Sequence, residues 1–184
     1  MPERLHFTGD DAADILLATN PLALLIGFAL DQQVTVPTAF LGPRKLEQRL
    51  GGLDAAAIAG MDAGDLEAAF REKPAVHRFP GNMARRVQEL CATIMSEYGG
   101  DAASVWTDAK DDADLRKRIG SLPGFGPMKI TALGSVLAKR FGVAVAEPLV
   151  PKHPTLGDVD SREQMERYQA AKREHKAKMR AEAH

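Results

Sequence analysis

The 184-residue chain has a single cysteine, Cys91, few aromatic residues and almost no net charge. One cysteine excludes an internal disulfide, a cysteine-based zinc site and a four-cysteine iron–sulfur cluster within the chain. The longest apolar run, residues 21–30, is about half of the roughly 20 residues that a membrane-spanning helix needs. The first residues also lack the basic and then apolar pattern of a signal peptide. We therefore expect a soluble cytoplasmic protein without a membrane segment.

The formal net charge of −1 conceals an uneven distribution of charge along the chain. Residues 1–70 contain 4 basic and 10 acidic side chains, whereas residues 71–140 contain 12 basic and 8 acidic ones. Residues 161–184 contain 7 basic and 4 acidic side chains. Nucleic-acid-binding domains usually have a clear positive excess, but binding depends on the local field and not on the total charge. The total therefore does not exclude a nucleic-acid-binding surface on the basic segments.

Apolar residues recur at helical spacing along most of the chain, which predicts an all-α fold. Glycine, proline and acidic residues divide this pattern into about ten short helices. The clearest are expected at about residues 21–33, between Gly81 and Gly99, and from Pro127 to Arg140. From Arg162 onward the Ala/Glu/Lys/Arg-rich composition favours a further helix.

Two stretches are expected to interrupt this helical pattern. Pro37 and the pair Gly42–Pro43 should break the chain before a short helix at residues 45–50. The only β-like run, residues 143–150, contains Pro148 and is expected to be an extended loop.

The segment Leu122-Pro-Gly-Phe-Gly-Pro127 is the densest turn in the sequence and joins two predicted helices. Gly124 and Gly126 can adopt positive φ and let another backbone approach closely, and Pro127 suits the first position of a helix. Free backbone amides at a helix N-terminus, with the positive end of the helix dipole behind them, form an anion site. The nearby Arg116, Lys117, Arg118 and Lys129 make a phosphate the expected ligand, although a plain turn would use the same glycines.

This segment resembles the LPG-x-G hairpin of the helix-hairpin-helix (HhH-GPD) DNA glycosylase superfamily, which includes endonuclease III and 3-methyladenine DNA glycosylase II. Residues 29–39, Ala-Leu-Asp-Gln-Gln-Val-Thr-Val-Pro-Thr-Ala, resemble a helix end of the 3-methyladenine branch. Residues 78–87, Arg-Phe-Pro-Gly-Asn-Met-Ala-Arg-Arg-Val, are similar to a glycine-then-basic helix start between those two motifs. The resemblance covers roughly residues 20–150, and the chain looks most like small actinobacterial-type HhH-GPD base-excision repair proteins.

The resemblance implies a two-lobed all-α domain at residues 1–160, without an iron–sulfur cluster, followed by a basic helix at residues 161–184. Double-stranded DNA would lie in the cleft between the lobes, with the target base flipped out. It also implies a monomer in the bacterial cytoplasm, associated with the nucleoid, and no cofactor except a possible monovalent cation at the backbone of Leu122 and Gly124. The residues implied to contact DNA are Gln32, Gln33, Arg85, Arg86, Gly124, Phe125, Gly126, Met128 and Lys129.

The sequence departs from the family pattern at the catalytic carboxylate. Excision makes the sugar electron-poor, so a nearby carboxylate is needed to stabilise it or to activate water. The family has an aspartate about 18 to 20 residues after the position of Met128, and Glu147 is the only carboxylate in that window. Asp31, at the end of an apolar helix beside Gln32, is the second candidate. Glu147 is equally suited to a solvated loop, and Asp31 to a cap or an ion pair.

Family members that also cleave the strand have a lysine at the position of Met128, and methionine cannot act as the amine. Lys129 lies about 100° further around the helix and is expected to point elsewhere. We therefore predict a monofunctional DNA glycosylase that acts on a damaged or mismatched base. A DNA-binding member without catalysis and an α-helical interaction protein unrelated to DNA remain as alternatives. The aromatic side chains of Phe79, Tyr98, Trp106 and Phe141 are expected in the core.

Overall fold

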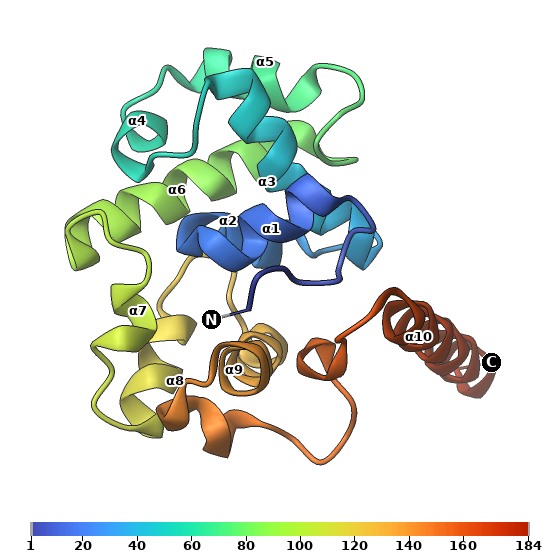
Figure 1. Ribbon diagram of the computed structural model, residues 1–184. Helices are drawn as coiled ribbons and strands as arrows, with labels where there is room; N and C mark the ends of the chain where they lie inside the picture. Colours follow the sequence, from blue (N-terminus) through green and yellow to red (C-terminus); the bar gives the residue numbers. More distant parts are fainter. Residues whose placement is uncertain (1, 184) are drawn as a thin grey trace.

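The computed structural model describes residues 2–183, and every regular element within them is helical (Figure 1). The first half contains α1 (Asp11–Thr19), α2 (Pro21–Leu30), α3 (Val36–Leu50), α4 (Ala55–Ala59), α5 (Ala63–Arg71) and α6 (Pro80–Tyr98). The second half contains α7 (Ser104–Thr107), α8 (Asp112–Gly120), α9 (Pro127–Phe141), the 3-10 helices η1 (Ala144–Leu149) and η2 (Leu156–Asp158), and α10 (Arg162–Glu182).

The helices pack into two lobes, which confirms the predicted two-lobed all-α fold. In the first lobe α1 to α6 contact one another, and in the second α7, α8 and α9 pack with the two 3-10 helices. Helix α2 forms the centre of the first lobe, where all its residues after Pro21 are buried. The ring of Phe40 on α3 packs edge-on against Phe28 of α2 and against Phe7, at 5.0 Å between centroids in each pair.

Helices α2 and α3 differ from the sequence prediction at their ends and in their interior. Helix α2 ends at Leu30 and not near residue 33, and Gln33 adopts a left-handed conformation with φ of 60°. Pro37 and Gly42–Pro43 do not interrupt α3, which runs unbroken through all three residues. Pro37 lies in the first turn, where a missing N–H costs no hydrogen bond. Gly42 faces α2 so closely that a Cβ atom would lie 2.4 Å from the Leu30 side chain.

The predicted extended loop at residues 143–150 is also wrong, because most of it forms the 3-10 helix η1. Tertiary packing accounts for the difference. Ala146 and Leu149 are buried, and Leu149 covers Gly134 of α9, where a Cβ atom would lie 2.7 Å from it. Proline is compatible with such a turn because its φ angle is close to the 3-10 value.

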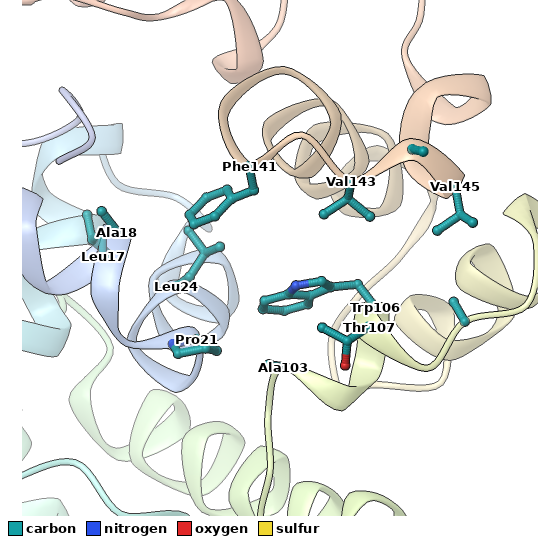
Figure 2. A pocket seen from close by; sticks show the side chains of 12 residues that line it. Leu17, Ala18, Pro21, Leu24, Ala103, Trp106, Thr107, Phe141, Val143 and Val145 are labelled. Atoms are coloured by element: carbon teal, nitrogen blue, oxygen red, sulfur yellow. The ribbon is translucent and has the colours of Figure 1, made fainter. Parts of the chain in front are cut away.

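An apolar hollow of about 440 Å³ lies between the lobes, at the start of α2 and the end of α9 (Figure 2). The indole of Trp106 forms one wall and is 6% exposed, and Leu24, Phe141 and Val143 line the hollow together with it (Figure 2). The predicted core position of Trp106 is thus confirmed, and Tyr98 and Phe141 are partly buried against the core. Phe79 is 38% exposed, so its predicted core position is wrong.

Candidate nucleic-acid interface

A cleft of about 950 Å³ lies at the other ends of α2 and α9. Five segments line it: the end of α2 with Asp31 and Gln32, Arg86 of α6, residues 120–132 around the hairpin, the loop at 153–156, and α10 through Tyr168 and Lys172. The helix end and the hairpin, both singled out in the sequence, therefore meet in one cavity between the lobes. Of the two candidate carboxylates, only Asp31 lines this cleft.

The two hairpin glycines have different backbone roles. Gly124 has a φ of 80°, which other residues rarely adopt, whereas Gly126 is extended, with φ of −85° and ψ of −175°. A positive φ is therefore needed at Gly124 but not at Gly126. The amide of Phe125 donates to the Leu122 carbonyl at 3.1 Å and its ring is buried, so this side chain packs inward. Met128, by contrast, is 87% exposed at the mouth of the cleft.

Helices α6 and α9 lack side-chain caps at their N-termini. Each begins with a proline after a residue whose side chain makes no capping bond, Phe79 before α6 and Gly126 before α9. Uncapped helix starts leave first-turn amides free for an anion. Every other helix of nine or more residues in the described chain has a cap, provided by Asp10, Asn20, Thr35, Asp62, Asp111 or Ser161.

Two basic side chains connect the hairpin with the end of α2. The Nη1 atom of Arg86 donates to Oε1 of Gln32 at 3.1 Å, and its guanidinium lies against Gly124, where a Cβ atom would be 2.4 Å away. The Nζ atom of Lys129 donates to the Ala29 carbonyl at 3.3 Å and lies 5.7 Å from the centre of the Phe125 ring. Lys129 therefore lines the cleft, and the expectation that it points elsewhere is wrong. Its position in the first turn of α9, directly beside α2, makes this orientation possible.

The cleft perturbs the pKa values of Asp31 and Lys129, which both line it. Burial raises the pKa of Asp31, while the charges of Lys172, Lys129 and Lys176 oppose that rise. Burial lowers the pKa of Lys129 to about 8; the charge of Arg86 also lowers it, whereas that of Asp31 raises it. A carboxylate and an amine with pKa values shifted toward neutrality are typical of groups that transfer protons or react at functional sites.

His77 holds the Gln32 segment in place and does not face solvent. It is 2% exposed, and its Nδ1 atom accepts the amide proton of Phe79 at 3.0 Å. The Nε2 atom lies 3.1 Å from the Leu30 carbonyl and 2.9 Å from that of Gln32, so Nε2 must carry the proton. Burial lowers the pKa of His77, which favours this neutral form. The imidazole thereby links the end of α2 to the start of α6.

Three of the predicted site residues lie outside the cleft lining. Gln33 is exposed beside the cleft, in its left-handed conformation. Arg85 is exposed on α6 and donates to Asn82. Glu147 is an exposed residue of η1, which packs against α8 and α9. The structure therefore does not bring Glu147 together with Asp31.

Sequence reasoning missed several residues at the cleft. Tyr168 and Lys172 line it from α10, and His153 from the preceding loop. No local pattern marks these residues, because only the course of the chain after η1 brings them to the hairpin. Phe79, exposed at the start of α6, lies 6.0 Å from the buried His77 ring between ring centres.

Within residues 2–183, no group of three or more histidine, cysteine, aspartate or glutamate side chains is placed to hold a metal ion. In the same residues no single helix is long and apolar enough to cross a membrane, although the bent pair α1–α2 has the length and composition of a broken span.

Comparison with known families matches residues 26–184 to the HhH-GPD superfamily of base excision DNA repair proteins. No curated protein and no solved structure matches the chain. The matched region contains the end of α2, the start of α6, the hairpin and α10, and therefore every segment that lines the cleft. The chain belongs to the HhH-GPD superfamily of base excision DNA repair proteins.

Proposed function

We propose that this protein is a monofunctional DNA glycosylase that hydrolyses the N-glycosidic bond of a flipped, damaged or mismatched base, with Asp31 as its catalytic carboxylate. The observation that carries the proposal is the convergence of Asp31, Gln32 and the Gly124–Met128 hairpin in one cleft of about 950 Å³. Such a cavity is large enough for a nucleobase and its sugar. The pair Gln32–Gln33, which directly follows the end of α2, supports a place in the 3-methyladenine-like branch.

The chemistry requires a group that stabilises positive charge on the sugar as the base departs. The bond between C1′ and the base nitrogen breaks, and its electron pair leaves with the base. The carboxylate of Asp31 would stabilise the electron-poor sugar and accept a proton from the water that adds to C1′. The departing base takes up a proton, so the products are free base and an abasic site. A raised pKa makes Asp31 a better proton acceptor than an ordinary aspartate.

Duplex DNA would be held from both sides of this cleft. The uncapped starts of α9 and α6 offer backbone amides to phosphates, and Arg86 and Lys129 add positive charge between them. These contacts fix the position of the DNA without reading sequence. The Leu122 carbonyl accepts one hydrogen bond, from Phe125, and a carbonyl has a second lone pair. It could therefore also hold the monovalent cation proposed at Leu122 and Gly124, and no other cofactor is proposed. Action on chromosomal DNA as a monomer, at the nucleoid, follows from this proposal.

A panel of duplexes with single lesions tests the proposed activity. Uracil, hypoxanthine, 8-oxoguanine and alkylated purines would be incubated with excess protein, and abasic sites would be revealed by alkaline cleavage. We expect excision of at least one lesion. Salt-dependent duplex binding without any excision would instead indicate a catalytically inactive DNA-binding protein. Absence of salt-dependent binding would exclude both of these functions.

The position of Lys129 favours a second candidate function, cleavage of the strand at the abasic site. Its pKa of about 8 leaves about a tenth of the amine neutral at pH 7, which is the form that attacks a carbonyl carbon. In this reaction the amine adds to C1′ of the ring-opened abasic sugar, and the carbonyl oxygen leaves as water to give a Schiff base. Loss of a C2′ proton then breaks the C3′–O bond and releases the downstream strand with its 5′ phosphate, and water hydrolyses the Schiff base to free the lysine.

Borohydride trapping distinguishes the two candidate functions. A monofunctional enzyme gives no covalent adduct with abasic DNA, whereas a lyase that uses Lys129 gives one that disappears in Lys129→Gln. Trapping should also increase between pH 7 and pH 9, because the amine loses its proton in that range. An adduct that persists in Lys129→Gln would assign the amine to another residue.

A further inference from the structure

Helix α10 lines the cleft along one face. Met165 is buried and anchors the helix to the protein, and Tyr168 and Lys172 lie in the cleft lining. Lys176 follows one turn later and is close enough to Asp31 for its charge to lower the pKa of that carboxyl. Spacings of three and four residues place these four side chains in a single stripe along the helix.

The stripe adds Lys172 to a cleft lining that is already cationic. Asp31 is the only acidic residue in the cleft lining, which also contains Arg86, Lys129 and Lys172. None of the salt bridges found in residues 2–183 involves Lys172 or Lys176. Helix α10 thus adds cationic groups to the cleft, and within residues 2–183 these form no close ion pair, although both act on the charge of Asp31.

The shape of α10 indicates which ligand these lysines would meet. The helix has 21 residues and so spans roughly 30 Å, which is close to one turn of duplex DNA. Figure 1 shows its C-terminal part extending away from both lobes. Regularly spaced cations that begin inside a cleft and continue outward fit a phosphate backbone.

We propose that α10 is a third wall of the DNA cleft, in which Lys172 and Lys176 bind backbone phosphates beside the flipped nucleotide. This inference rests on the proposed function, because the phosphates belong to the DNA that the hairpin holds. The lysines act on affinity and on the position of the DNA, and the chemistry remains with Asp31.

The salt dependence of duplex binding tests the proposal. The variant Lys172→Ala/Lys176→Ala is compared with Arg167→Ala/Lys178→Ala, which removes the same charge from exposed positions about 120–180° around the helix from the two test lysines. All four positions lie on the surface helix, and alanine is the strongest helix former. Loss of two phosphate contacts should reduce the slope of log affinity against log salt by about 2, and affinity by roughly tenfold. The control pair should change the slope by much less.

The proposal would be overturned if the test variant and the control variant changed the salt dependence equally, or if neither changed it. Both results leave the proposed function intact if the wild-type protein still binds and excises. A wild-type protein without any salt-dependent binding to duplex DNA would overturn the inference together with the proposed function. Folding of each variant is checked by its helical circular dichroism and its melting temperature.

Discussion

Replacing Asp31 by asparagine is expected to lower the excision rate by roughly 10²- to 10⁴-fold, the range typical for loss of a general acid or base. The side chain keeps its size, and within residues 2–183 the Asp31 carboxylate accepts no hydrogen bond that the change could break. Duplex affinity should stay equal or increase, because the change removes a negative charge from a cleft that holds a polyanion. Single-turnover excision with saturating enzyme measures the rate, and fluorescence anisotropy measures the affinity.

The matched control is Glu147→Gln. Glu147 lies in the window where the family has its aspartate, but it is exposed on η1 outside the cleft lining. We expect its substitution to change the excision rate by less than about threefold, as for a surface carboxylate without a catalytic role. A reversed pattern, with Glu147→Gln inactive and Asp31→Asn active, would show that Glu147 is the catalytic carboxylate.

Although Asp31→Asn is expected to lower the excision rate, it should raise the free energy of unfolding. Because burial raises the folded-state pKa of Asp31 above its ordinary value of 3.8, the ionised carboxylate destabilises the folded protein at every pH above that raised pKa. Asparagine removes this cost, so Asp31→Asn should have the higher free energy of unfolding at pH 7. The difference should shrink as pH falls and vanish below about pH 3.8, where aspartate is neutral in both states. Urea unfolding at several pH values measures it.

The pH dependence of excision follows from the same shift. The reaction needs Asp31 in its ionised form, so activity should fall as pH decreases through the raised pKa of this carboxyl. An enzyme whose excision rate is independent of pH from 7 down to 4 would contradict a role for Asp31 as the base.

Local sequence signals were sufficient for the helical class and the hairpin, and they marked Gln32 as a site residue although α2 ends earlier than predicted. The hairpin could be predicted because glycine and proline have backbone preferences that do not depend on distant contacts. The same reasoning failed at Gly42–Pro43, where close packing against Leu30 keeps α3 continuous. It also treated Gly124 and Gly126 alike, although only the first has a positive φ.

The cleft itself is built by contacts between segments that lie far apart in the sequence, and no short motif reveals such contacts. Lys129 was expected to point away, because its place on the helix was judged without knowing that α2 lies beside the first turn of α9. Tyr168 and Lys172 reach the site from 35 or more residues beyond the hairpin. Exposed Phe79 could have been recognised only by its link to buried His77. Such residues become visible once tertiary packing brings distant segments together.

The second large effect is expected for Gly124→Ala, which should reduce duplex affinity by roughly tenfold or more, as for loss of a phosphate site with a neighbouring cation. Alanine at φ of 80° costs about 1–2 kcal/mol, so the melting temperature should also fall. The new Cβ would lie 2.4 Å from Nη1 and 2.9 Å from Cζ of Arg86, and this side chain must move. Its displacement breaks the hydrogen bond to Gln32 and separates the hairpin from the end of α2.

Two matched variants separate strain from charge in this prediction. Gly126→Ala has a permitted φ of −85° and no atom within 4 Å of the new Cβ, so its stability should match the wild type within about 0.5 kcal/mol. Arg86→Ala removes the cation while leaving Gly124 unstrained, and should lower affinity without the full loss of stability. If Gly124→Ala bound duplex DNA as tightly as the wild type, the hairpin would be a plain turn and DNA would have to bind elsewhere. If instead Arg86→Ala accounted for the whole loss of affinity, the guanidinium and not the hairpin backbone would be the main phosphate ligand.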